Sequence, residues 1–150
     1  MGFADMIQLA TNGFYCTFRC LFPGVQPPIF LDVIIIMPLT SCWFAYTMIA
    51  QTMAFNRFYS LWFISSAERV FSLRNTYVIL GACWLYGVCH GVVRSTPWVH
   101  LFYDPNTYSI LYDQRPGSKV ALKVNGILNY VHSALILFWY ILICLKVLIE

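Results

Sequence analysis

Charged residues are scarce in this sequence, and their scarcity excludes an ordinary soluble domain. Asp, Glu, Lys and Arg make up 10% of the 150 residues, whereas hydrophobic residues make up 60%. Soluble domains carry roughly 25% charged and about 45–50% apolar residues. No basic run could follow a phosphate backbone, so no nucleic-acid partner is predicted. The long uninterrupted apolar runs favour an all-α, polytopic membrane protein surrounded by lipid, because the strands of a membrane barrel alternate apolar and polar residues.

Motifs that carry chemistry are also missing. The sequence has no Gly-rich phosphate loop, no GxSxG and no HExxH, and its three histidines lack a catalytic partner at motif spacing. Its six cysteines lie in or beside apolar stretches, unlike those of a secreted disulfide framework. Cys16 and Cys20 are four residues apart but have no second pair to complete a metal site. We therefore predict no catalytic residue, no metal and no other cofactor.

Gaps between charged residues locate the expected membrane spans. Uncharged stretches of 24, 19 and 22 residues occur at 33–56, 75–93 and 124–145. Each can cross a bilayer, because a transmembrane helix needs about 20 mostly apolar residues. The first 21 residues are more polar, but they lack the basic start and uniform apolar segment of a signal peptide, so they are predicted as a fourth span. We expect a single domain over 1–150, with spans near 1–21, 29–57, 75–94 and 120–147.

The charges in the connections between the spans do not predict which side of the membrane each connection faces. Residues 63–74 form a polar connection, and residues 94–117 form a long one with recurring turn chemistry. Four Lys and Arg residues fall on one side of a four-span bundle and five on the other. The positive-inside rule needs a clear excess on one side, and this sequence has none.

Polar residues within the spans are candidates for interhelical or functional contacts, because ionisable groups in a membrane are expensive. Asp5 is either a polar hub between helices or an interfacial residue of a span that begins later. Asp32 either complements the dipole at a helix N-terminus or contacts a ligand. Gln51 and Asn56, with small alanines beside them, suit interhelical hydrogen bonds.

Two further patterns concern helix packing. Pro38 lies inside the second span, where it frees a backbone carbonyl and favours a kink. Gly87 and Gly91 form a small-xxx-small spacing that allows two helices to approach closely.

Short motifs in a consistent order resemble a known receptor family. Residues 54–58, Ala-Phe-Asn-Arg-Phe, resemble the Asn-Arg signature at the cytoplasmic end of the third helix of nematode serpentine chemoreceptors, which are seven-helix G-protein-coupled receptors. Residues 20–23 resemble the C-x-x-P before that helix, and Trp43 falls where a tryptophan is expected in its middle. Weaker similarities occur at 1–6, 67–71, 74–76, 96–97, 103–105 and 129–132. The class T group is the most similar, with class X as the near alternative.

The resemblance implies a topology and a set of site residues. The four spans would correspond to helices two to five of the receptor bundle, with 63–74 in the cytosol and 95–118 outside. Asn56 and Arg57 would face a heterotrimeric G protein, and Asp32 and Trp43 would lie on the side of a small-molecule ligand. Asp5 and Gln51 would be polar groups inside the membrane. A functional receptor of this kind would reside in the plasma membrane.

The sequence departs from the family pattern at several points. The acidic residue expected after the Asn-Arg pair is absent, and Leu135-Ile136 replaces an Asn pair in the fifth helix. Residues 95–118 contain no cysteine, so the disulfide that often ties this loop to the third helix cannot form. Helices one, six and seven have no counterpart, so the resemblance implies a partial receptor that is not expected to signal alone. The alternative function is a non-receptor four-helix membrane protein, such as an assembly subunit or scaffold.

Overall fold

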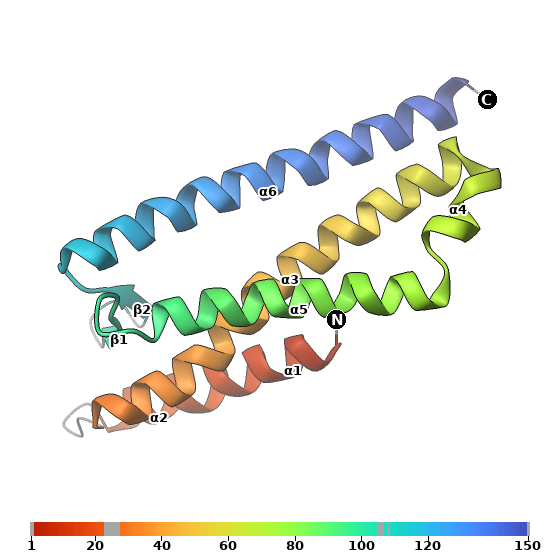
Figure 1. Ribbon diagram of the computed structural model, residues 1–150. Coiled ribbons are helices and arrows are strands. Elements are labelled where there is room, and N and C mark those ends of the chain that lie inside the picture. Colours follow the sequence, from red (N-terminus) through yellow and green to blue (C-terminus); the bar gives the residue numbers. More distant parts are fainter. Residues whose placement is uncertain (1, 23–27, 105–106, 108, 150) are drawn as a thin grey trace.

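The computed structural model, which describes residues 2–22, 28–104, 107 and 109–149, is an elongated bundle of helices (Figure 1). The chain is 83% helical, which confirms the predicted all-α membrane bundle. The elements in order are α1 (Gly2–Ala10), a π-helix η1 (Thr11–Tyr15), α2 (Cys16–Leu21), α3 (Ile29–Trp62), α4 (Ile64–Val70), α5 (Leu73–Arg94), β1 (Leu101–Asp104), β2 (Ser109–Tyr112) and α6 (Pro116–Ile149).

Three helices in the described part of the chain are long and apolar enough to cross a membrane. They are Val33–Trp62, Leu73–Arg94 and Pro116–Ile149, and they coincide with three of the predicted spans. The N-terminal segment is helical from Gly2 to Leu21, but the π-helical turn divides it into pieces of 9, 5 and 6 residues. Its crossing of the membrane therefore stays a prediction.

Helix α3 is the centre of the bundle. Helices α5 and α6 and the N-terminal segment all pack against it, and α1 lies along its N-terminal half (Figure 1). The buried apolar side chains reflect this, because most of them belong to α3: Ile36, Cys42, Phe44, Ala45, Ile49 and Ala54. Different faces of α3 thus contact the three neighbouring segments.

Small residues bring α3 and α5 together. Gly87 and Gly91 are buried on α5 and face Ser41 and Ala45 of α3, a second pair of small residues four apart. A Cβ atom added at Gly87 would lie 2.8 Å from the Cβ of Ala45, and one at Gly91 would overlap Ser41. The close approach that the Gly-xxx-Gly spacing predicts is therefore made against α3.

The long connection after α5 contains a β-hairpin, whereas the sequence predicts only turns there. Strands β1 and β2 pair antiparallel, with Leu101 opposite Tyr112 and Asp104 opposite Ser109. Each strand is rich in the aromatic and aliphatic residues that suit a half-buried pleated surface. The hairpin lies at one end of the bundle and α4 at the other (Figure 1).

Candidate functional site

A cavity of about 280 Å³ lies beneath the hairpin. Its wall comes from α1, η1, α3, α5, the hairpin and α6: Gln8, Asn12, Leu39, Thr40, Trp43, Phe44, Arg94, Leu101, Ile110, Tyr112 and Asn125. The wall is mixed, with aliphatic side chains from α3 and the hairpin and polar ones from η1, α1, α5 and α6. Small-molecule sites in proteins are concavities of this kind, apolar with a few convergent polar groups.

Arg94 brings the strongest charge to this wall. It is the last residue of α5, yet only 5% of its surface is exposed. Its Nε donates a hydrogen bond of 3.0 Å to the Tyr112 hydroxyl, and its Nη1 donates one of 2.8 Å to Nδ1 of His90. Its Cζ lies 4.3 Å from the centroid of the Phe44 ring, a cation–π distance. The guanidinium is thus held inward, between the hairpin and α3.

A line of aromatic and polar side chains runs from Arg94 toward the middle of the bundle. The His90 ring stacks on Phe44 with centroids 4.1 Å apart, and Tyr86 meets His90 edge to face at 4.5 Å. Tyr86 also meets His132 of α6 edge to face at 6.4 Å. The line joins α3, α5 and α6, which are the three helices of spanning length.

Gln51 of α3 is the last residue in this line of contacts. Its Nε2 lies 2.6 Å from Nδ1 of His132 and 3.3 Å from the His132 carbonyl oxygen. His132 is buried, and its Nε2 has no hydrogen-bond partner among the described residues. The contact links α3 to α6 through polar groups in an otherwise apolar region.

Two residues of the cavity wall leave hydrogen-bonding capacity unused. Nε2 of Gln8 and Oδ1 of Asn125 are buried and have no partner among the described residues. Buried polar atoms are normally paired, so an unpaired one calls for an explanation such as a bound molecule or water. Both residues line the same cavity, but these two atoms are buried behind its surface.

The hairpin is fastened to the N-terminal segment by Tyr103. This side chain is 3% exposed, and its hydroxyl lies 2.7 Å from the Cys20 Sγ. Its ring meets Tyr15 edge to face at 6.4 Å, and the Arg19 guanidinium lies 5.8 Å from the ring centroid. These noncovalent contacts tie down a loop whose sequence has no cysteine for a disulfide.

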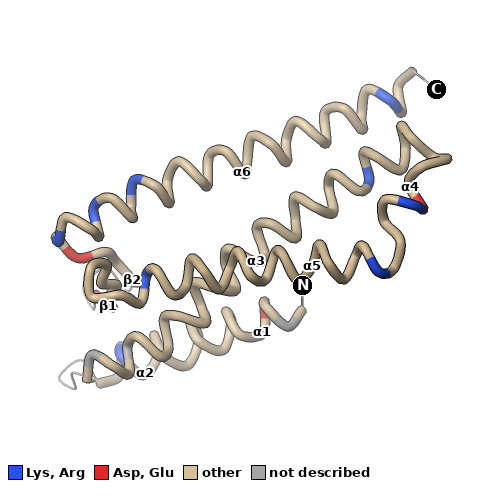
Figure 2. Tube along the Cα trace, in the orientation of Figure 1, with Lys and Arg blue, Asp and Glu red and all other residues tan. Residues whose placement is uncertain are grey.

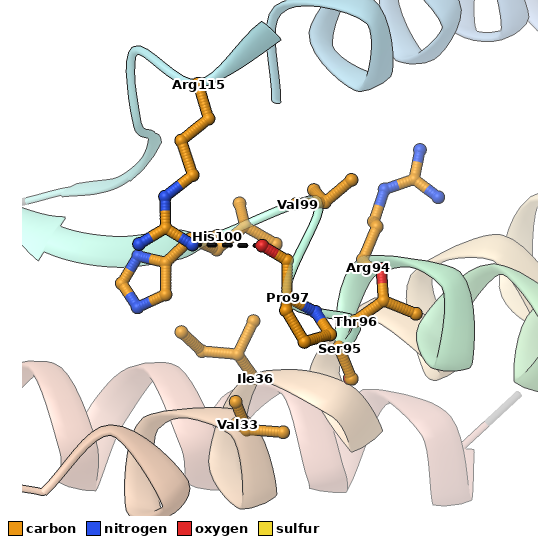
Figure 3. A pocket seen from close by; sticks show the side chains of 10 residues that line it. Val33, Ile36, Arg94, Ser95, Thr96, Pro97, Val99, His100 and Arg115 are labelled. Carbon is orange, nitrogen blue, oxygen red and sulfur yellow. Dashed lines mark hydrogen bonds between the residues drawn. The ribbon is translucent and has the colours of Figure 1, made fainter. Parts of the chain in front are cut away.

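A second cavity, of about 290 Å³, lies between α3 and the connection after α5. Val33 and Ile36 of α3 form its floor, and Figure 3 shows the Arg94 side chain directed away from them. Arg115 reaches over this cavity, but its Nη1 donates to the Pro97 carbonyl at 3.0 Å and its Nε lies 2.8 Å from the Asp113 carboxylate. Its charge is therefore already engaged.

Asp113 lies at the base of the hairpin, outside the spanning helices. Burial acts to raise the pKa of Asp113, but a hydrogen bond from the Ser118 side chain opposes it. The Arg115 backbone N–H and the positive charges of Arg115 and His100 act in the same direction as Ser118, so the pKa of Asp113 lies below its ordinary value. The carboxylate is thus favoured in its charged form.

The Asn56–Arg57 pair lies toward the opposite end of the bundle, near the end of α3. Arg57 is exposed and makes no ion pair with any residue in the described ranges. Asn56 accepts a hydrogen bond of 3.3 Å from the Ser60 hydroxyl. Lys and Arg residues occur at both ends of the bundle, and the middle carries few (Figure 2).

An aromatic cluster supports this end of α3. The Phe55 ring lies 5.0 Å from Trp139 of α6 and 6.2 Å from Phe71, which follows α4. Phe58 also contacts Trp139 at 5.0 Å, and the Tyr59 ring lies 6.1 Å from Phe71. The cluster packs the segment of α3 that carries Arg57 against α6 and against Phe71.

The structure separates the site residues predicted from sequence. Trp43 lines the cavity beneath the hairpin, and Gln51 bonds to His132. Asp5 is exposed in the first turn of α1. The backbone of Asp32 belongs to α3, but its side chain lies outside the described residues.

Sequence reasoning missed the polar wall of the cavity. In the sequence, Arg94 only marks the end of an uncharged stretch. Gln8 is only one of the polar residues that make the first 21 residues a less apolar span. The sequence shows that His90 and His132 lack a catalytic partner at motif spacing, but it does not predict their hydrogen bonds to Arg94 and Gln51. The useful signal was that Gln8, His90 and Asn125 are polar residues inside apolar runs, where polar groups turn toward other helices.

Comparisons with known proteins give one match. A protein-family model described as serpentine type 7TM GPCR chemoreceptor Srx matches residues 2–150. Neither a curated protein nor a solved structure gives a significant match. Srx corresponds to class X, which the sequence motifs indicated as the near alternative. The motifs themselves resemble the class T group most. The match and the three apolar helices together establish an integral, multi-pass membrane protein. As a receptor, it belongs to the plasma membrane. Because nearly the whole chain is covered, the protein belongs to the Srx family of serpentine seven-transmembrane chemoreceptors.

Proposed function

We propose that this protein is a chemosensory receptor that binds a small molecule beneath the hairpin and engages a heterotrimeric G protein at the Asn56–Arg57 end. The observation that carries the proposal is the cavity itself, which unites polar groups from α1, α5 and α6 under one hairpin. Membership of a chemoreceptor family supports the same function.

The size and lining of the cavity support a small ligand. About 280 Å³ is near the lower end of the range for small-molecule sites, so a compact guest is expected. Trp43 would contact such a guest, because it contributes to the wall. Asp32 stays a ligand-side candidate from the sequence resemblance alone.

The position of Arg57 supports coupling at the other end. An exposed guanidinium with no ion-pair partner among the described residues is free to meet a partner protein. Ligand binding at one end would favour one arrangement of the helices, and the G protein would read that arrangement at the other. The simpler alternative for Arg57 is anchoring at the membrane interface.

The test measures nucleotide exchange by the G protein. Membranes would hold the 150-residue chain, or the same chain joined to helices one, six and seven of another Srx family member, and GTPγS uptake by a heterotrimeric G protein would be followed with a panel of small molecules. We expect ligand-dependent exchange from the joined version. Arg57→Ala should reduce it at least tenfold without changing ligand binding.

The matched control is Arg74→Ala, an exposed arginine near the start of α5 at the same end of the bundle. It should leave exchange unchanged. If the two substitutions have equal effects on exchange, Arg57 acts as an anchor at the membrane interface and not as a contact for the G protein. If no ligand produces exchange in either version while the protein is folded, the non-receptor alternative, an assembly subunit or scaffold, would be favoured.

A further inference from the structure

The charge of Arg94 is buried without an opposite charge. Only 5% of its surface is exposed, and no carboxylate in the described part of the chain lies within ion-pair distance of it. Its hydrogen-bond partners, the Tyr112 hydroxyl and the ring nitrogen and carbonyl of His90, are neutral acceptors. Burying a charge is costly unless an opposite charge or several hydrogen bonds compensate it.

A purely structural role explains only part of this arrangement. As the last residue of α5, Arg94 complements the negative end of the helix dipole. An arginine at a helix end can do so while its head reaches water, because its long stem allows the charge to snorkel. Here the guanidinium instead turns inward over Phe44. The dipole accounts for a cation at this position, but not for its burial.

One nitrogen of the guanidinium has no protein partner. Nε and Nη1 are engaged, whereas Nη2 has no hydrogen-bond partner among the described residues. Arg94 lines both the cavity beneath the hairpin and the neighbouring cavity beside Val33 and Ile36. Of these two, the cavity beneath the hairpin is the one toward which the inward turn over Phe44 carries the charge, because Phe44 also lines it.

The other residues of the cavity wall indicate the chemical character of the rest of the ligand. Leu39, Leu101 and Ile110 are aliphatic, and Trp43 and Phe44 are aromatic. Gln8 and Asn125 add uncharged amide side chains to the wall. The wall therefore pairs one cationic corner with a mainly apolar remainder.

We propose that the ligand of this cavity carries an oxyanion, a carboxylate or a phosphate, which binds Arg94. This inference rests on the proposed function, because it names the ligand class of the same cavity. The planar guanidinium offers donors that match the geometry of an oxyanion. An aliphatic or aromatic body attached to the oxyanion fills the apolar remainder.

The first experiment uses wild-type protein and needs no variant. The full chain is reconstituted in nanodiscs of uncharged phosphatidylcholine, and binding of hexanoate is compared with binding of 1-hexanol and methyl hexanoate. Quenching of tryptophan fluorescence is the readout, because Trp43 lines the cavity. Hexanoate should bind at least tenfold more tightly than either neutral analogue.

The second experiment replaces the charge. Arg94→Gln should reduce hexanoate affinity at least tenfold and leave hexanol affinity unchanged, while Arg94→Lys should retain most of the hexanoate affinity. Arg74→Gln is the matched control, because Arg74 lies at the other end of the same helix and is exposed. Circular dichroism checks that each variant is folded, and the wild-type comparison stands even if Arg94→Gln is not.

A third arm distinguishes a soluble ligand from a lipid headgroup. Nanodiscs containing anionic phosphatidylglycerol should compete with hexanoate only if a lipid phosphate is the natural oxyanion. Competition that disappears in Arg94→Gln assigns the site to a lipid, and its absence assigns the site to a soluble anion. Both results support an oxyanion site.

Two results would overturn the inference. Equal affinity for hexanoate and hexanol would show a neutral cavity and would leave the proposed receptor function intact. Hexanoate binding that survives in folded Arg94→Gln would place the anion elsewhere. If none of the three probes binds, the oxyanion site is rejected, while the nucleotide-exchange assay continues to test the receptor function separately.

Discussion

Gln51 and His132 illustrate how one pair of residues can hold two membrane helices together. The 2.6 Å contact between Gln51 Nε2 and His132 Nδ1 joins α3 to α6 within their membrane-spanning stretches. We expect a double-mutant cycle of Gln51→Ala and His132→Ala to give a coupling free energy of about 0.6 kcal/mol, the average for hydrogen bonds between membrane helices, and at most about 1.7 kcal/mol. Unfolding in mixed SDS micelles would supply the four free energies.

The control pairs Gln51→Ala with His100→Ala. His100 precedes the hairpin and has no contact with Gln51, so these two substitutions should add without coupling. A coupling near zero for Gln51 and His132 would mean that the hydrogen bond does not contribute to the stability of the fold.

Asp113 predicts how the hairpin responds to acid. Its pKa in the folded protein lies below the ordinary value of 3.8. The contribution of Asp113 to stability is therefore complete above about pH 4, and it is lost as the pH falls through the folded pKa. Because the partner Arg115 is more than half exposed, the loss should be below about 1 kcal/mol.

Hydrogen exchange at the hairpin amides between pH 5 and pH 2, corrected for intrinsic rates, would measure this response. In Asp113→Asn the extra loosening at low pH should be absent. Identical pH profiles for the two proteins would show that the carboxylate does not hold the hairpin.

Single residues also show where sequence reasoning ends. Arg94 marks the end of a helix in any reading of the sequence, because a charge closes an apolar run. The inward direction of its side chain depends on Tyr112 and Phe44, which lie 18 and 50 residues away along the chain. No local pattern encodes those contacts, so the central residue of the cavity was not predictable.

At the scale of elements, the contact between α3 and α5 depends on the absence of side chains. Ala at Gly87 or Gly91 would collide with the backbone of Ser41 or with its side chain. We expect each substitution to destabilise the protein by about 1–3 kcal/mol, as overpacking does. Thermal unfolding of purified protein in nanodiscs would measure the change.

Gly81→Ala is the matched control on the same helix. A Cβ at Gly81 meets no atom within 4 Å, so this change should be neutral or slightly stabilising, by up to about 1 kcal/mol from helix propensity. Similar losses at Gly81 and Gly91 would attribute the effect to the helix itself and not to packing.

The elements themselves were unequally predictable. Charge gaps predict α3, α5 and α6 well, because a spanning helix must exclude charge over its whole length. The hairpin was missed because its strands have only four residues each and lie among turn residues. Its position depends on Tyr103 packing against residues more than 80 positions earlier, such as Cys20.

At the scale of the whole molecule, the fold makes a prediction about topology. The hairpin and α4 lie at opposite ends of the bundle (Figure 1), so they should lie on opposite sides of the membrane. The Asn-Arg signature favours the α4 end as cytosolic. Inserted glycosylation acceptor loops should therefore be modified at Gln114 and not at Ser66, as a gel-shift assay in microsomes would show.

The informative control is the same acceptor loop after Ile149, which should also stay unmodified because α6 returns to the α4 end. Modification at both Ser66 and Gln114 would contradict the arrangement of α3 and α5. Modification at Ser66 alone would keep the bundle but reverse it, and the receptor orientation would be lost.

The π-helical turn at Thr11–Tyr15 has a consequence for how the gene for this chain can change. A π-turn contains one residue more than an α-turn, so the loss of one codon there returns the turn to α-helical geometry and is absorbed locally. The same event in α5 would rotate Gly87 and Gly91 away from α3 by about 100°, since each residue advances an α-helix by that angle. Asn12, which lies in the π-turn, lines the cavity. The cavity wall can therefore change its spacing through a single deletion, while the contact that holds α3 to α5 cannot.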